Sequence, residues 1–399
     1  MALLNIDTDK PETERSIALF DLGFRPFFLL AGISAVVLLA FWIYTYATGS
    51  SGSGYYPAMV WHGHEMIFGY TVAVIAGFLL TAVRNWTGLQ TPAGYPLAGL
   101  ALLWLAGRVS PLFSDVLPHW SIAVVDLAFL PILAIVLSVP LLRKRQKHNL
   151  VFLLVLAALT LANLQVHLQL LGLTDAGASQ GLNFAIYIIV FLISILGGRV
   201  IPFFTETAIP AATARKWPAV EILSLGSLVV LIGLDLVAAA PVAIMLVAIL
   251  AALTHGARLF GWYHRRVLSI PLLWVLHLGY AWIVVGFVLK ALAAAGLINP
   301  MLALHAFTTA GIGTMTLGMM ARVALGHTGR ELRIGHWITL SFVLASLAAV
   351  ARVLLPIMLP HMYNDCVALA GVLWSAAFAI FVLHYAGILI RPRLDGRPG

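Results

Sequence analysis

Long apolar segments alternate with short polar connections along almost the whole chain. Apolar runs of about 20 residues, the length of helix that crosses a bilayer, recur from end to end. We predict twelve such spans, centred near residues 38, 72, 101, 130, 160, 191, 229, 250, 283, 312, 346 and 376. No soluble domain or long linker separates them. The pattern predicts an all-α integral membrane protein in which residues 1–399 form one polytopic domain.

Composition narrows the cofactors that such a domain could hold. Hydrophobic residues make up 62% of the chain and charged residues only 10%, whereas about a quarter of the residues of soluble proteins are charged. The single cysteine, Cys366, excludes an internal disulfide, a cysteine-held iron–sulfur cluster and c-type haem attachment. Residues 1–16 are polar and mixed in charge, so we expect no cleavable signal peptide.

The charge distribution predicts how the spans are oriented. The net charge is +8, but connections such as SGSGYYPAM and LGLTDAGASQ, which follow odd-numbered spans, carry no lysine or arginine. By the positive-inside rule we expect both termini in the cytoplasm, and the charge reflects topology rather than nucleic-acid binding. The basic residues lie in the N-terminal tail (Lys10, Arg15, Arg25) and after every even-numbered span, most clearly at 143–147, 214–216, 264–266, Arg333 and 391–397.

Two parts of the chain resemble each other. Gly88 follows His64 by 24 residues, and Gly329 follows His305 by the same 24 residues. Together with the spans that come after them, these segments make spans 2 to 4 resemble spans 10 to 12. Arg199 marks a weaker third copy around spans 6 to 8. We therefore predict a three-fold repeat of four-helix units.

This predicted architecture is similar to that of the haem–copper oxidase core. That core also has twelve helices in three units, cytoplasmic termini, and metal ligands on spans 2, 6 and 10. Transporters also have twelve spans, although usually as two six-helix halves. Architecture alone leaves both a redox protein and a transporter open, because fold does not fix function.

Five histidines inside the predicted spans are candidates for holding a cofactor. Topology places His62 and His64 at the outer end of span 2, and places His167 in span 5 and His305 in span 10 at a similar depth. These four are the candidate metal ligands, because imidazole binds haem iron and copper. His277, in span 9, lies nearer the cytoplasmic side and is a separate cofactor-binding candidate. An intramembrane histidine can also simply bond a neighbouring helix.

Helix geometry separates the two histidines of the sequence WHGHEM. Residues two apart on an α-helix point about 200° away from each other, so His62 and His64 cannot easily bind one metal. They can serve two centres on opposite sides of span 2. We expect one of the pair to share a low-spin haem with His305. The other would face a second haem or a copper site to which His167 contributes.

Three charged residues complete the candidate site. Arg108 and Arg352 lie at the outer ends of spans, where they could bind haem propionates. They could instead form salt bridges with Glu65, Asp115 or Asp365. Glu65 is the candidate catalytic residue, because an acid at the outer face could deliver protons to a buried centre. It could also orient a histidine.

The sequence resembles the NnrS family over nearly its whole length. Six blocks carry the resemblance: LFDLGFRPFFLLAG (19–32), WHGHEMIFGY (61–70), AGFLLTAVRNWTG (76–88), GGRVIPFFT (197–205), PLLWVLHLGYAW (271–282) and HAFTTAGIGTMTLGMMARVALGHTGR (305–330). The resemblance implies a bacterial inner-membrane protein that contains haem and copper, associated with nitric oxide metabolism and protection from nitrosative stress. The candidate histidines inside these blocks are His62, His64, His277 and His305; His167 fits less clearly.

The leading functional prediction is a haem-containing redox protein, similar to a nitric oxide reductase, that binds nitric oxide and reduces it to nitrous oxide. The expected cofactors are two b haems, with copper as a further candidate. Electrons would come from quinol in the bilayer or from a periplasmic protein. Two alternatives stay open: a haem-based nitric oxide binder or sensor without turnover, and a transporter of copper, haem or a nitrogen compound. The sequence also leaves a homodimer open.

Overall fold

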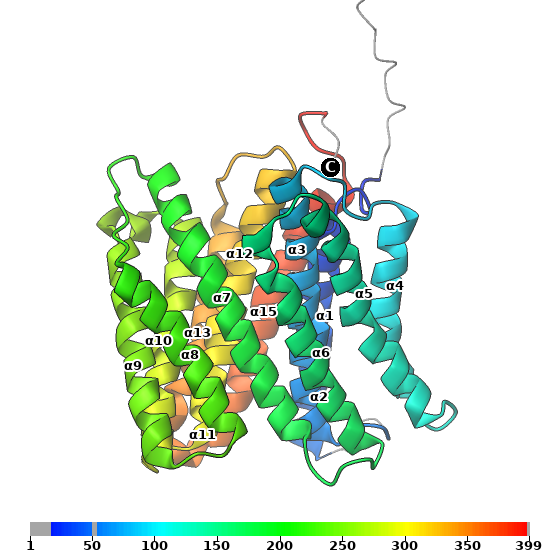
Figure 1. The fold of residues 1–399 in the computed structure, drawn as a ribbon, viewed down its shortest axis with the longest axis vertical. Helices are drawn as coiled ribbons and strands as arrows, with labels where there is room; N and C mark the ends of the chain where they lie inside the picture. The colour runs from blue at the N-terminus through cyan, green and yellow to red at the C-terminus, as the bar shows by residue number, and fades with distance from the viewer. Residues whose placement is uncertain (1–16, 50–53, 397–399) are drawn as a thin grey trace, which may run out of the picture.

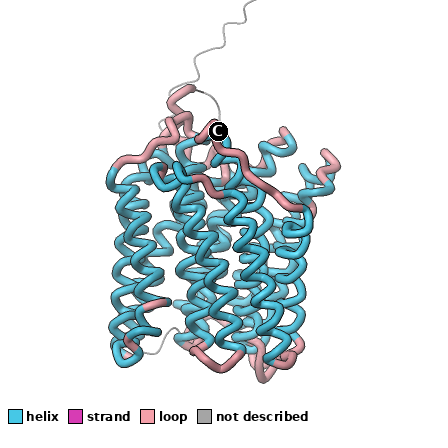
Figure 2. The backbone as a smooth tube through the Cα atoms, turned by 90° about the vertical axis from the view of Figure 1, so that its left-hand side faces the viewer, coloured by secondary structure: helices cyan, strands magenta, loops and turns pink. Residues whose placement is uncertain are grey.

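The chain forms a bundle of long helices in a computed structural model that describes residues 17–49 and 54–396 (Figure 1, Figure 2). These described residues contain no β-strand. Large apolar side chains such as Leu154 and Phe260 are exposed on the outside of the bundle, as expected of helices that contact lipid. Lys10 and Arg15 of the basic tail lie outside the described residues.

Eleven helical segments are long and apolar enough to cross a membrane. This confirms the prediction of an all-helical, multi-pass membrane fold. The segments are α1 (Phe24–Thr48); α2 (Ala58–His64) with η1 (Glu65–Thr71) and α3 (Val72–Thr87); α4 (Tyr95–Val109) with η2 (Ser110–Phe113); α5 (His119–Arg143); η3 (Lys147–Asn149) with α6 (Val151–Leu170); α7 (Ala178–Ala208); α8 (Pro218–Leu236); α9 (Pro241–Trp262); α10 (Pro271–Ala294); α13 (His336–Val353) with α14 (Leu355–Met358); and η6 (Pro360–Met362) with α15 (Tyr363–Ile390).

The predicted span near residue 312 is helical but is not one of these eleven segments. It consists of α11 (Pro300–His305), η5 (Ala306–Ile312) and α12 (Gly313–His327), which follow one another without a break. Threonines, glycines and Arg322 make this stretch less apolar than its neighbours. The count of twelve spans therefore stays a prediction.

Local sequence explains where several helices begin. Proline is the first residue of α8, α9, α10 and α11. Its fixed φ suits the start of a helix, and its missing N–H is not needed there. The α3 segment ends before Gly88, which has a φ of 66°. Glycine adopts this left-handed conformation without a steric penalty.

Two π-helical segments occur at matching positions. The η1 segment begins directly after His64, and η5 begins directly after His305. Gly88 and Gly329, each 24 residues beyond its histidine, both have positive φ. Short π-helical segments within α-helices occur frequently at functional sites. The matched positions make His64 and His305 candidates for a functional site. The three-fold repeat stays a prediction.

The bundle has two distinct ends. We call the end that carries the C-terminus the C-terminal face, and the opposite end, where α2 and α11 begin and α6 ends, the histidine face (Figure 1). The basic connections after α5, α7, α9 and α12 all lie at the C-terminal face. Arg25 also lies at that face but is buried, because its Nη1 donates to the carbonyls of Leu389 (3.0 Å) and Arg391 (2.7 Å) at the end of α15. Arg25 is therefore part of the bundle rather than of a free basic tail.

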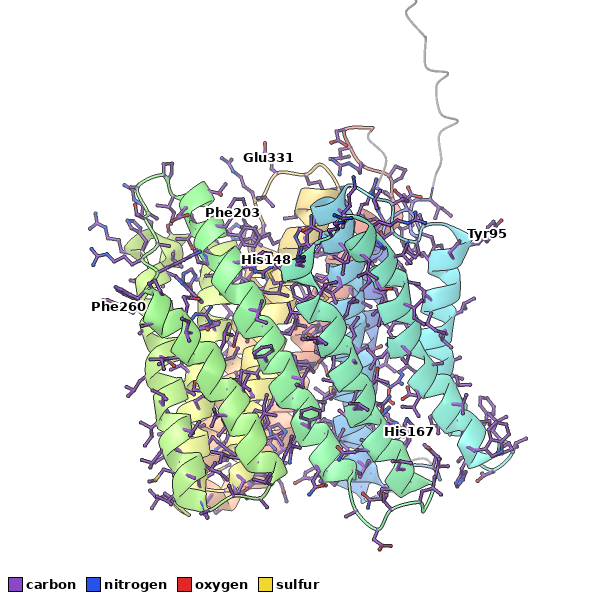
Figure 3. The ribbon with its side chains drawn as sticks, viewed as in Figure 1. Tyr95, His148, His167, Phe203, Phe260 and Glu331 are labelled. Carbon is purple, nitrogen blue, oxygen red and sulfur yellow. The ribbon has the colours of Figure 1, made fainter. Side chains whose placement is uncertain are left out.

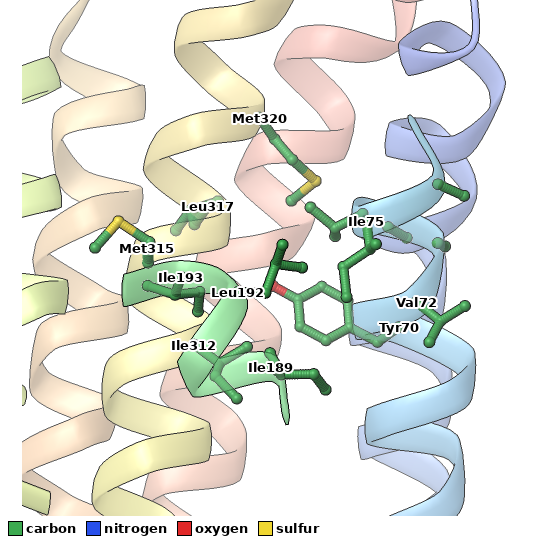
Figure 4. Packing of buried hydrophobic residues seen from close by; sticks show 14 of the residues in the cluster. Tyr70, Val72, Ile75, Ile189, Leu192, Ile193, Ile312, Met315, Leu317 and Met320 are labelled. Carbon is green, nitrogen blue, oxygen red and sulfur yellow. The ribbon is translucent and has the colours of Figure 1, made fainter. Parts of the chain in front are cut away.

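The centre of the bundle joins the two segments that contain the π-helices. Figure 4 shows Tyr70 of η1 directed toward side chains of α7 and η5, among them Ile189 and Ile312. The Tyr70 hydroxyl lies 2.5 Å from Oγ1 of Thr316 in α12. Thr316 in turn donates to the Ile312 carbonyl at 2.7 Å. A hydrogen bond between buried side chains therefore connects the segment that follows His64 to the segment that follows His305.

Candidate functional site

A cluster of buried polar side chains lies near the histidine face. Four membrane segments supply it: His64 ends α2 and Glu65 begins η1, Arg108 is near the end of α4, and Asp126 is on α5. Asn163 and His167 are one turn apart on α6 and so share one side of that helix. Figure 3 shows His167 near the histidine face and His148 at the C-terminal face. We call His64, Glu65, Arg108, Asp126, Asn163 and His167 the Asp126 cluster.

Three potential metal ligands converge at the centre of this cluster. Oδ2 of Asp126 lies 3.2 Å from Nε2 of His64 and 2.9 Å from Nε2 of His167. The three ligand atoms lie within 4.8 Å of one another, and all three residues are buried. Nδ2 of Asn163 donates to the same Oδ2 at 2.7 Å. Two imidazoles and one carboxylate form a donor set that suits copper, zinc or non-haem iron.

A contact at Nδ1 holds the His167 ring so that Nε2 faces Asp126. The hydroxyl of Tyr55 lies 2.7 Å from Nδ1 of His167. Burial raises the pKa of Tyr55, so the hydroxyl keeps its proton. It can then donate to Nδ1 while Nε2–H donates to Asp126. With a metal on Nε2 the ring proton would lie on Nδ1, and Nδ1–H would donate to the Tyr55 oxygen, the arrangement that commonly orients metal-binding histidines.

His64 faces a carboxylate at each ring nitrogen. Nδ1 lies 3.1 Å from Oε1 of Glu65, and Nε2 lies 2.9 Å from Oδ1 of Asn163 and 3.2 Å from Oδ2 of Asp126. Nη1 of Arg108 donates to the same Glu65 oxygen at 2.8 Å, and its Nη2 forms a close ion pair with Oδ1 of Asp126. A neutral imidazole has one donor and one acceptor, so it cannot satisfy two carboxylates. Two carboxylates and one guanidinium carry a formal charge of −1, which a metal ion or an added proton would balance.

The salt bridge between Arg108 and Glu65 is one of the alternatives that the sequence left open, and it is present. Asp126, which the sequence analysis did not single out, is the second partner of Arg108. Asp115 is exposed and makes no ion pair in the described structure. Oε2 of Glu65 is buried without a hydrogen-bond partner among the described residues. Glu65 therefore orients His64 and keeps one oxygen available.

A second group of side chains surrounds the other histidine of WHGHEM. The His62 ring stacks on Trp42, with 4.4 Å between ring centroids and 13° between planes. Its Nδ1 is buried and has no hydrogen-bond partner in the described part of the chain. His305 and Arg352 both lie close enough to interact with His62 electrostatically. We call His62, His305 and Arg352 the His305 cluster.

The His305 cluster retains unused hydrogen-bonding groups. Nδ1 of His305 donates to the Met301 carbonyl at 2.8 Å, which leaves Nε2 as the free acceptor of the ring. Nη2 of Arg352 donates to the Tyr363 hydroxyl at 3.2 Å. Nη1 of Arg352 is buried and has no partner among the described residues. A buried guanidinium without an anion is costly, so this cluster is suited to an anionic group.

The two histidines of WHGHEM thus belong to different clusters. His64 meets His167 and Asp126, whereas His62 lies with His305 and Arg352. This is the separation that the helix geometry predicts. His277 belongs to neither cluster and lines a groove between α9 and α10.

Sequence reasoning missed Asp126, Asn163 and Tyr55. Asp126 is an ionisable residue in the middle of a long apolar segment, and such residues usually mark functional sites in membrane proteins. Asn163 is four residues before His167, so the two share a helix face. These two signals were present in the sequence. Tyr55 lies in a connection and gave no comparable signal.

The space beside Asp126 limits what the cluster can bind. A cavity of about 10 Å³, lined by Trp104, Arg108, Asp126, Phe129 and Asn163 among others, borders it. A space of this size holds about one water molecule. The space beside Asp126 is therefore the size of a single small group, much smaller than a haem.

Comparison with known proteins identifies one family. A family model described as NnrS protein matches residues 18–393 of the chain. No curated protein matches the sequence.

Proposed function

The chain belongs to the NnrS family, and from this premise we propose that it is a nitric oxide-response membrane protein that binds nitric oxide and reduces it. Family membership carries the association with nitric oxide. The chemistry is our inference from the two clusters. The alternative functions are a nitric oxide binder without turnover and a transporter.

One observation carries the proposal: His62 and His64 belong to two clusters with different chemistry. A two-electron reduction benefits from one centre that relays electrons and one that binds the substrate. The His305 cluster suits the first role. His62 and His305 would hold the iron of a b haem, and Arg352 would bind a propionate. The unpartnered Nδ1 of His62 and Nη1 of Arg352 fit this assignment.

The Asp126 cluster suits the second role. His64, His167 and Asp126 would hold a metal ion, with copper as the leading candidate. Glu65 and Tyr55 orient the two histidines through their Nδ1 atoms. The small cavity argues for a bare ion here rather than a second haem. When loaded, the two centres would supply a redox-active haem and a metal to which nitric oxide can bind.

The residues of the chain account for the proton chemistry. Reduction of two molecules of nitric oxide to nitrous oxide and water consumes two electrons and two protons. Oε2 of Glu65 has no hydrogen-bond partner among the described residues, and Oε1 of the same carboxylate lies 3.1 Å from Nδ1 of His64, so Glu65 can hold a proton for this reaction. Electrons would come from quinol in the bilayer or from a periplasmic protein.

The topology of the proposal follows from the distribution of charge. We assign the C-terminal face, with its basic connections, to the cytoplasm of a bacterial inner membrane. The stretch 300–327 would be the twelfth span, and the matched π-helical segments support a repeat of four-helix units. Nucleic acid is not an expected partner, and a homodimer is compatible with this topology.

The test is to titrate the purified protein with nitric oxide and follow optical and electron paramagnetic resonance spectra. The comparison uses His62→Ala, His305→Ala, His64→Ala and Asp126→Asn. We expect the first two to remove a low-spin haem signal and the last two to remove a separate metal signal. His336→Ala, at an exposed position, is the control. A protein without haem, or with spectra unchanged by all four substitutions, would contradict the proposal and favour a transporter. One gas-binding haem without turnover would favour a sensor.

A further inference from the structure

A groove on the outside of the bundle lies far from both clusters. Its volume is about 610 Å³, and α9, η4 (Arg265–Ser269) and α10 line it near the C-terminal face. Figure 3 shows Phe260 at the outer edge of the bundle, and 75% of this side chain is exposed. Along α9 the groove runs from Gly256 to Phe260, about 6 Å at 1.5 Å per residue, and Tyr263 directly follows the end of the helix. This size lies within the range of small-molecule sites.

The groove opens toward lipid rather than toward water. Its lining is mostly apolar and includes Leu259, Phe260, Leu268 and Leu278. The helices α9 and α10 both qualify as membrane spans. A ligand that enters the groove must therefore be soluble in the hydrocarbon of the bilayer.

Three side chains that can form hydrogen bonds line the groove, Tyr263, Trp274 and His277, and of these His277 is the buried one. It is 7% exposed, and its Nδ1 donates to the Leu273 carbonyl at 3.0 Å. Nε2 is therefore the acceptor of the ring. No described residue donates a hydrogen bond to Nε2, and the nearby Trp262 carbonyl is itself an acceptor. A buried acceptor without a donor costs free energy.

We propose that this groove binds a quinol, with a ring hydroxyl donating to Nε2 of His277 and the apolar tail lying in the bilayer. This inference rests on the proposed redox function, because it identifies the entry point of the electrons. A quinol brings both features that the groove requires, a hydroxyl donor and a hydrocarbon body. A lipid acyl chain would leave Nε2 without a partner.

The redox balance is complete with quinol as the donor. One quinol and two molecules of nitric oxide give one quinone, one nitrous oxide and one water. Oxidation of the quinol releases two electrons and two protons, which are the numbers consumed at the other end. The hydroxyl proton that faces His277 passes to Nε2, which is free to accept it.

Two substitutions test the shape of the groove and the chemistry of His277 separately. Gly256→Leu fills the groove, and a Cβ at Gly256 meets only Val284 at an ordinary distance of 3.7 Å, so the backbone has room for a side chain. His277→Gln replaces the imidazole with an amide, whose oxygen can accept the hydrogen bond but which cannot take up the proton. The matched controls are Gly233→Leu, on a part of α8 where a Cβ meets nothing within 4 Å, and His336→Gln in an exposed position.

The experiment measures binding of a short-chain benzoquinone to the purified full-length protein, and nitric oxide consumption driven either by the corresponding quinol or by a soluble reductant. We expect Gly256→Leu to abolish quinone binding, whereas His277→Gln should bind within about tenfold of wild type, because the amide can still form one hydrogen bond. Both variants should lose quinol-driven consumption but retain consumption driven by the soluble reductant, whereas the controls should behave as wild type.

The results that would overturn the quinol site differ from those that would contradict the proposed function. Wild-type quinone binding in Gly256→Leu would overturn the quinol site, and the groove would then hold only lipid. Loss of a haem spectrum in His277→Gln would show that His277 is a haem ligand and would also overturn it. Absence of nitric oxide consumption with every donor would contradict the proposed function, and the quinone-binding measurement would still report on the groove.

Discussion

The Asp126 cluster and the His305 cluster contain similar residues but differ in charge balance. Each contains a histidine followed directly by a π-helical segment, and each contains an arginine near the histidine face. In the Asp126 cluster, Arg108 meets two carboxylates. In the His305 cluster, Arg352 donates to the Tyr363 hydroxyl, and no described residue partners its Nη1. The first cluster supplies its own anions and needs a cation, whereas the second needs an anionic group from elsewhere.

The strongest test of this difference exchanges each arginine for methionine. Arg108→Met leaves Glu65 and Asp126 buried without their cation, so we expect a loss of about 3–5 kcal/mol in the free energy of unfolding. Arg352→Met removes no carboxylate partner, so we expect a change below about 1 kcal/mol in the haem-free protein. Denaturation of both variants in detergent measures these values. Equal losses would show that the clusters do not differ in charge balance.

The second test concerns metal affinity. Asp126→Asn removes the charged ligand that both histidines face. Removing a group that only hydrogen-bonds to a metal ligand typically lowers metal affinity by about 10- to 100-fold, so we expect loss of this ligand to lower it by about 100-fold or more. Metal analysis after dialysis at a series of free-metal concentrations measures this. Asp115→Asn, at an exposed position, is the control. Unchanged affinity in Asp126→Asn would place the metal elsewhere.

A double-mutant cycle tests whether the two histidines of WHGHEM act separately. His64→Ala and His167→Ala remove groups from one cluster, so their effects on stability should couple by about 0.5–3 kcal/mol. His62→Ala and His167→Ala affect different clusters and should add within about 0.5 kcal/mol. Coupling of similar size in both pairs would mean that the two clusters behave as one site.

The smallest expected effect concerns the contact that orients His167. Tyr55→Phe removes one hydrogen bond to Nδ1, so we expect a loss of about 1 kcal/mol in stability and a roughly tenfold loss in metal affinity. Tyr95→Phe, at a side chain that is 95% exposed, should change neither. Full retention of metal affinity in Tyr55→Phe would remove this contact from the site.

Sequence periodicity predicted the helical membrane fold, and helix geometry predicted that His62 and His64 face different partners. Both follow from local rules, because apolar length and a turn of about 100° per residue depend on near neighbours only. The partners themselves were harder to predict. Asp126 is 62 residues from His64 in the chain, and no local pattern specifies which helices pack together. The π-helical segments after His64 and His305 also lack a sequence signal of their own.

Because His62 and His64 lie on one helix, the distance between the points where they join the two clusters is insensitive to movement of the other helices. The two residues differ by two positions, which is about 3 Å along the helix axis. Covalent bonds, not side-chain packing, therefore set the spacing between the attachment points of the two clusters. The other helices can shift, expand with temperature or adapt to bilayers of different thickness without changing this spacing. The spacing between His62 and His64 therefore stays constant while the rest of the bundle moves.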